Sequence, residues 1–226
     1  MDRLSQYCLE RRSRLFSKFF KLKPEKQQQI INAALKVFSR ENYKQASTDE
    51  IVIEAGISKG ALFHYFRSKK DLYLFLYDYV TKTLTDEYFS AVDLSERDIL
   101  LRLQQMCLLK LSLLKKHADM MNFTLKAFFE EDVEVKDIIN QKNKEILLKG
   151  YSNLLSNIDT SKLREDVDAQ MALNIIRWTF EGYANKEQAA LGHQPMDEEL
   201  FGKWISEMNG YIEIIRKCLY KGGNEP

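Results

Sequence analysis

The chain has 226 residues, 45% hydrophobic and 30% charged, which is enough to bury one large hydrophobic core or two smaller ones. Only three prolines and nine glycines occur in this length, and no clean run alternates hydrophobic and polar residues, so the composition favours long helices over strands. No hydrophobic run reaches the length of a membrane-spanning helix, and the N-terminus lacks a secretory signal. The three isolated cysteines argue against a disulfide framework and against a zinc site. We therefore expect an all-α protein of the cytoplasm.

The net charge of +1 conceals an uneven distribution along the chain. Residues 1–23 carry seven Lys or Arg against two acids, residues 24–75 carry eight against six, and residues 76–226 carry nineteen against twenty-five. A polyanion is therefore expected to bind at the N-terminal end, if it binds anywhere.

Residues 1–23 form a basic N-terminal extension in which arginines and lysines alternate with apolar and aromatic side chains. Leu4, Cys8, Leu15 and Phe19 approximate one helical stripe, which indicates an amphipathic helix. Three interpretations stay open: a basic arm lying along nucleic acid, a helix lying on a membrane surface, or an extra helix packed on the domain that follows.

The next helix is predicted from Pro24, which suits a first helical turn, to about Asn42. Residues 47–71 then predict two short helices joined by a tight turn. Ser47 or Thr48 can cap the first of them, Gly56 suits a left-handed helix end, and Ser58 can cap the second. This arrangement is the helix–turn–helix, whose second helix enters the major groove of DNA.

The same stretch resembles the TetR (tetracycline-repressor) family of regulators. The resemblance covers roughly residues 28–75, which is about a fifth of the chain. It rests on a combination of special positions rather than on any one residue. Asn42 and Phe63 depart from the family pattern, at positions where the family has mainly Gly and Tyr. The positions that match best are Gly56, Ser58, Gly60, Tyr65, Phe66 and Lys69.

Helical spacing separates the two faces of the second helix, with Leu62 and Phe66 pointing inward. Small residues allow a close approach to the groove, and donors or aromatic groups suit bases and phosphates. The resemblance also implies that Lys69 binds a phosphate. Together these arguments give the candidate DNA contacts Thr48, Ser58, Lys59, Gly60, Ala61, Phe63, His64, Tyr65 and Lys69.

The remaining sequence predicts six further helices, and between two of them Glu130, Glu131 and Asp132 are expected to form a solvated surface turn. Ser95 or Asp98 is the expected cap of the second of these helices. The predicted ranges are 69–91, 98–116, 118–130, 133–157, 168–191 and 197–220.

A cavity for an apolar effector is implied mainly by the resemblance, because TetR-like proteins bind inducers in their C-terminal domain. Each candidate could equally fill an ordinary hydrophobic core, since Met and aromatic residues at helical spacing usually do so. The candidate lining residues are Leu103, Met106, Cys107, Met120, Phe123, Phe128, Tyr151, Trp178 and Tyr183.

The sequence gives no support for catalysis. It contains no glycine-rich phosphate loop and no recognisable nucleophile motif, and its three histidines are scattered. We expect no cofactor, no metal ion and no enzymatic activity.

These observations predict a TetR-like all-α fold with a DNA-binding domain at 24–75 and a regulatory and dimerisation domain at 76–226. The expected function is ligand-responsive transcriptional regulation, most simply repression, by a homodimer that binds a palindromic double-stranded DNA operator. The dimer would pair the last two helices, through Trp178 and through Phe201, Trp204, Met208 and Ile212. Two alternatives remain: control by a protein or membrane partner, or an apolar-ligand carrier or helical enzyme with a vestigial motif.

Overall fold

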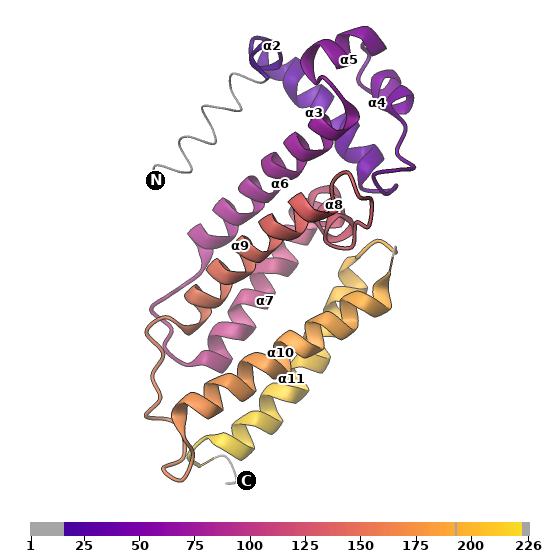
Figure 1. The fold of residues 1–226 in the computed structure, drawn as a ribbon. Helices are drawn as coiled ribbons and strands as arrows, with labels where there is room; N and C mark the ends of the chain where they lie inside the picture. The colour runs from indigo at the N-terminus through magenta and orange to yellow at the C-terminus, as the bar shows by residue number, and fades with distance from the viewer. Residues whose placement is uncertain (1–15, 193, 223–226) are drawn as a thin grey trace. The chain divides into compact units, whose positions relative to one another are not determined.

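The computed structural model describes residues 16–192 and 194–222, and over these ranges the chain is all-α, apart from one isolated bridge between Leu163 and Tyr220 (Figure 1). Most of the predicted helices are present with bounds close to those expected from the sequence. The helices are α2 (Ser17–Phe20), α3 (Pro24–Phe38), α4 (Thr48–Glu54), α5 (Lys59–Tyr65), α6 (Lys69–Ala91), α7 (Ile99–Lys116), α8 (Ala118–Phe128), α9 (Lys136–Leu155), α10 (Ala169–Leu191) and α11 (Glu198–Leu219).

The chain divides into two compact units that do not follow a single cut in the sequence. The first unit contains Met1–Thr83 together with Asn122–Lys142, and the second contains Leu84–Met121 and Asn143–Pro226. The division therefore differs from the expected boundary between residues 75 and 76. The end of α8, the start of α9 and the loop between them belong with the DNA-binding helices.

The helix–turn–helix forms for the reasons that its sequence suggests. The Ser47 hydroxyl accepts hydrogen bonds from the N–H groups of Asp49 and Glu50 and caps α4, while the Ser58 hydroxyl accepts one from the N–H of Ala61 and caps α5. Gly56 between them has a φ of +55°, where a side chain would cost about 1–2 kcal/mol. The turn angle between the two helices is thus set by one glycine and two caps.

An aromatic cluster fills the core of the first unit and includes residues from before the helix–turn–helix. Phe19 on α2 is fully buried, and its ring lies 5.0 Å from that of Phe66 and 5.1 Å from that of Phe75. Phe16 contacts the same two rings at 5.4 and 5.2 Å. Aromatic pairs at these distances add to the stability gained from burial alone. Of the three interpretations of residues 1–23, the described part therefore matches the extra packed helix, whereas residues 1–15 lie outside the described ranges.

The turn expected at residues 130–132 is not simply solvated. Glu130 is only 7% exposed, and its carboxylate accepts hydrogen bonds from the backbone N–H groups of Tyr43, Glu131 and Asp132. The Tyr43 hydroxyl donates to the carboxylate of Glu134 at 2.6 Å. A carboxylate bound by three N–H groups can be buried at little cost, and this one joins the α8–α9 loop to the α3–α4 loop.

The second unit packs α7, α10 and α11 around a common hydrophobic core, with α10 and α11 lying side by side and antiparallel (Figure 1). Met208 and Ile212, which the sequence assigned to a dimer interface, are 5% and 2% exposed because they pack inside this core. Trp178, which the sequence assigned to the same interface, is exposed on α10 together with Met171 and Ile175.

Two buried ionic side chains secure the N-terminal end of α7. Asp98 caps the helix, and it also accepts hydrogen bonds from the Tyr220 hydroxyl at 3.0 Å and from the Lys162 ammonium at 3.1 Å. Arg102 has no exposed surface and donates to backbone carbonyls, among them those of Glu96 and Leu154. Burial lowers the pKa of Arg102, and its backbone partners indicate a structural crosslink rather than a ligand site.

Candidate nucleic-acid interface

The exposed face of α5 agrees with the inward and outward assignment made from helical spacing. Leu62 and Phe66 are each 1% exposed, whereas Lys59, Gly60 and His64 are exposed and Phe63 is 36% exposed. The remaining candidates, Thr48, Ala61, Tyr65 and Lys69, are partly buried, and Ser58 is exposed. The fold therefore exposes five of the candidate residues at α5 and its N-cap: Ser58, Lys59, Gly60, Phe63 and His64.

Gly60 has no structural need to be a glycine. It lies in the first turn of α5 without positive φ, and a Cβ built on it would meet only the Ser58 hydroxyl oxygen, at 3.9 Å. Gly56 differs, because its positive φ demands a glycine even though a Cβ would make only an ordinary contact, at 3.6 Å from the Gln29 amide nitrogen. The fold itself therefore does not require a glycine at position 60, and its role in the approach to DNA stays a prediction.

Acidic neighbours neutralise several cations of the helix–turn–helix. The ammonium group of Lys59 lies 2.8 Å from a carboxylate oxygen of Asp49, and Lys36 and Arg40 pair with Glu54 and Glu50. All three pairs are exposed, so each contributes little to stability and can be exchanged for a phosphate contact. Lys59 therefore stays a predicted DNA contact, in competition with Asp49.

Lys69, the predicted phosphate ligand, is held against the α3–α4 loop. Its ammonium donates to the Lys44 carbonyl at 3.1 Å and lies 5.0 Å from the centre of the Tyr43 ring. Burial lowers the pKa of Lys69, while Asp132, Glu134 and Glu130 oppose that shift. A role of Lys69 at a phosphate remains a prediction, and in this structure its ammonium contacts the Lys44 carbonyl and the Tyr43 ring.

Two contacts of the DNA-binding unit were not anticipated from the sequence. The first is Lys18 on α2, whose ammonium lies 3.3 Å from Nδ1 of His64 on α5. The second is the bond network of Tyr43 with Glu130 and Glu134 described above. Both contacts join residues more than 40 positions apart in the sequence, so no local pattern could have identified the partners. For the Tyr43 network, the acidic run at 130–132 was the local signal that polar side chains gather there.

The nine candidate effector-binding residues are spread over both compact units, and their role as a cavity lining stays a prediction. Phe123 belongs to the core of the first unit, 5.3 Å from the Tyr73 ring, because α8 crosses between the units; Trp178 is 59% exposed. Leu103, Cys107 and Tyr183 pack in or against the core of the second unit. Met120 and Phe128 are partly buried on α8, and Tyr151 lies beside Arg177.

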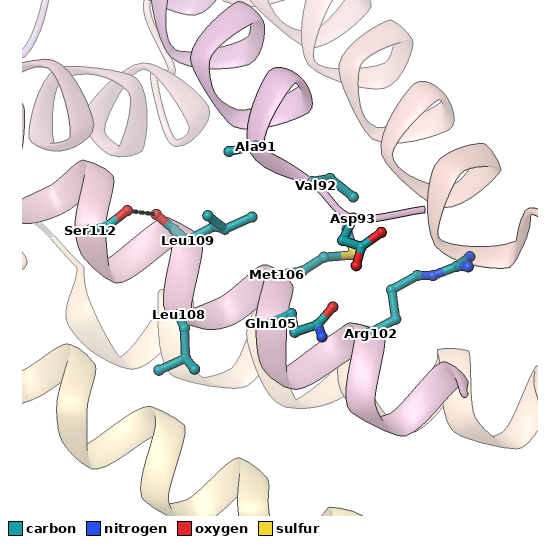
Figure 2. Close-up of a pocket in the computed structure, with 9 residues that line it drawn as sticks. All are labelled: Ala91, Val92, Asp93, Arg102, Gln105, Met106, Leu108, Leu109 and Ser112. Atoms are coloured by element: carbon teal, nitrogen blue, oxygen red, sulfur yellow. Dashed lines mark hydrogen bonds between the residues drawn. The ribbon is translucent and has the colours of Figure 1, made fainter. Parts of the chain in front are cut away.

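A cavity of about 310 Å³ does lie within the second unit, and Met106 is the candidate that lines it. Its wall joins the end of α6 to α7, with α7 side chains facing residues 91–93 (Figure 2). The size is at the lower end of the range for small-molecule sites. The lining is mainly apolar with a few polar groups: Ala91, Val92, Asp93, Arg102, Gln105, Met106, Leu108, Leu109 and Ser112.

Comparison with known families decides the identity of the helix–turn–helix. Residues 30–75 match the family described as bacterial regulatory proteins of the tetR family. The chain carries the TetR-family DNA-binding domain. The matched segment runs from α3 into α6 and includes α4, the Gly56 turn and α5, whereas α2 precedes it.

Curated relatives extend the similarity of this TetR-like chain beyond the DNA-binding domain. The chain is 25% identical over 169 residues to the fatty acid metabolism regulator protein of Bacillus subtilis, covering 71% of this chain and 82% of that one. It is also 45% identical over 62 residues to the HTH-type transcriptional regulator YuxN of Bacillus subtilis, covering 27% of this chain and 21% of that one. Both relatives are named as regulators.

Solved structures show the same TetR-like fold over most of the chain. The fatty acid degradation regulator FadR of Bacillus halodurans aligns with a TM-score of 0.58 at 21% identity, covering 84% of this chain and 97% of that one. FadR of Bacillus subtilis, solved in complex with stearoyl-CoA, aligns with a TM-score of 0.52 at 22% identity, covering 83% and 96%. No helix among the described residues is long and apolar enough to cross a membrane.

Proposed function

We propose that this protein is a homodimeric, effector-responsive transcriptional repressor that binds a palindromic DNA operator and acts on the chromosome in the cytoplasm. One observation carries the proposal: α5 exposes a glycine that the fold does not require, between exposed candidate contacts, inside a TetR-family DNA-binding domain. A missing side chain on a recognition helix lets the helix backbone approach base edges and phosphates.

The exposed apolar stripe on α10 supports the homodimer. Met171, Ile175 and Trp178 are spaced four and three residues apart, so they lie on one helical face, and they are 67%, 46% and 59% exposed. Ile214 on α11 is 61% exposed. An apolar stripe of this kind is typical of an association surface, and a two-fold dimer would pair α10 and α11 with the same helices of a second copy.

We infer that the effector is a long-chain acyl-CoA or its fatty acid. The support is the similarity to a fatty acid metabolism regulator and to a FadR structure that holds stearoyl-CoA, together with the mainly apolar cavity of the second unit. Apolar lining suits an acyl chain, and Gln105 and Ser112 add hydrogen-bonding groups to the lining.

Three helices would carry the effector signal, because the chain passes from one unit to the other within α6, α8 and α9. α6 ends at the cavity wall and begins at Lys69, directly after the recognition helix. An effector that binds one conformation better shifts the spacing of the two recognition helices, and a spacing that mismatches half-sites about one DNA turn apart lowers affinity.

Titration calorimetry with stearoyl-CoA tests this proposal, using coenzyme A alone as the matched control for the nucleotide part. We expect binding of stearoyl-CoA and not of coenzyme A, and a change in affinity equivalent to about 1–3 kcal/mol when operator DNA is present. Equal affinity with and without operator would show that the site is not regulatory. Binding of coenzyme A alone would show that the acyl chain is not what the cavity recognises.

A further inference from the structure

We propose that Lys18, which lies outside the helix–turn–helix, binds DNA together with His64. It would add a DNA contact beside those made by the recognition helix α5. The proposal rests on the DNA-binding function proposed above and names an additional residue for it. It is carried by the position of Lys18 beside α5, by the attachment of α2, and by the charge surroundings of the pair.

α2 is held in place by two buried aromatic side chains, that of its N-cap Phe16 and that of Phe19. Phe16 is 4% exposed and Phe19 is fully buried, and both contact the rings of Phe66 and Phe75. Phe66 directly follows α5, so α2 is anchored to the C-terminal end of the recognition helix. Lys18 lies between the two anchors in the sequence but is exposed. Its side chain therefore extends from a fixed base rather than from a loose arm.

The side chain of Lys18 reaches the recognition helix. Its ammonium lies 3.3 Å from Nδ1 of His64, an exposed residue of α5. An ammonium group can only donate, so the His64 Nδ1 in this contact accepts and the ring proton resides on Nε2. The pair then presents several N–H donors: those of the ammonium that His64 does not use, and the Nε2–H. Such donors match phosphate oxygens and the acceptor edges of bases.

The electrostatic surroundings of Lys18 differ from those of three other exposed cations of the domain. Lys36, Arg40 and Lys59 each have a carboxylate partner, whereas the partner of Lys18 among the described residues is the imidazole of His64. Within residues 16–192 and 194–222, a phosphate that approaches Lys18 therefore displaces no carboxylate from it, and the Coulomb attraction between phosphate and ammonium favours the contact. Lys21 and Lys23, also exposed, add positive charge close by in the sequence.

The test measures the salt dependence of binding to a fluorescein-labelled duplex that the wild-type protein selects from a random library. Lys18→Met keeps most of the aliphatic stem and removes the charge, Lys18→Arg restores it, and Lys217→Met, an exposed lysine of α11, is the matched control for a lost charge. Removing one phosphate contact lowers the slope of log K against log salt by about 0.9, which is an affinity loss of roughly eight-fold at 0.1 M salt.

We expect that loss for Lys18→Met, recovery for Lys18→Arg and wild-type behaviour for Lys217→Met. His64→Ala should cost less in the Lys18→Met background than in wild type, because the ring proton of His64 is then no longer fixed. An unchanged slope for Lys18→Met in a protein that still binds the duplex would overturn this inference alone. Failure of the wild-type protein to bind any duplex would instead overturn the proposed function. Near-ultraviolet circular dichroism of each variant checks that the aromatic cluster stays folded.

Discussion

Gly60 offers a prediction in which stability and DNA binding move in opposite directions. The residue is helical, has no positive φ, and has only the Ser58 hydroxyl oxygen within 4 Å of a built Cβ, at 3.9 Å. Glycine in a helix costs about 0.5–1 kcal/mol relative to alanine, so Gly60→Ala should stabilise the folded protein by up to that amount. If the bare backbone approaches the groove, the same methyl group should lower operator affinity by about ten-fold or more, equivalent to roughly 1.4 kcal/mol.

The assay pairs urea unfolding with fluorescence anisotropy on operator DNA. Gly150→Ala on α9 is the matched control, because a Cβ there also meets nothing within 4 Å but lies in the other compact unit. We expect Gly150→Ala to gain stability without losing affinity, and Gly60→Glu, which adds bulk and a negative charge, to abolish specific binding. Wild-type affinity in both Gly60 variants would refute the assignment of this face to DNA.

Two further predictions concern the second unit. Trp178→Glu should shift the protein from dimer to monomer in sedimentation at micromolar concentration, because it places a charge on the apolar stripe of α10; an unchanged dimer would move the interface elsewhere. Asp98→Ala should lower the free energy of unfolding by about 2–4 kcal/mol at pH 7, since it removes the α7 cap and leaves the Tyr220 hydroxyl without its acceptor. Burial alone would raise the pKa of Asp98, but hydrogen bonds from Lys162, Tyr220 and backbone N–H groups outweigh it and lower the pKa. The charge therefore stabilises the fold above the usual Asp range near pH 4 and stops doing so as the pH falls through the folded pKa. The difference in stability between wild type and Asp98→Asn, which keeps an acceptor but no charge, should accordingly shrink with acid; a difference independent of pH would contradict this.

Much of the fold could be predicted because helix ends depend on residues that are close together in the sequence. Ser47, Ser58, Asp98 and Asp168 each cap the helix that the pattern led us to expect, and Gly56 has the left-handed backbone that its position indicated. Helical spacing also placed Leu62 and Phe66 in the core correctly. These are short-range effects, so a single sequence contains the information.

The parts that could not be predicted depend on pairs distant in the sequence. Nothing local distinguishes Glu130, which is buried and binds the N–H of Tyr43, from an exposed acid in a surface turn. The same holds for the contact of Phe123 with the Tyr73 ring, and for Met208, which fills the protomer core instead of a dimer interface. Helical spacing shows that a residue lies on an apolar face of its helix. It does not show whether that face packs in the protomer core or against another surface.

The central claim is that the protein binds DNA through α5 as a symmetric dimer. DNase I footprinting of the region upstream of its own gene tests that claim most directly, with Gly60→Glu as the non-binding control. The account predicts protection of a palindromic site with half-sites about one helical turn apart, lost in Gly60→Glu and weakened by stearoyl-CoA. Protection that persists in Gly60→Glu, or no sequence-specific protection by the wild-type protein anywhere in that region or in a randomised library, would contradict it.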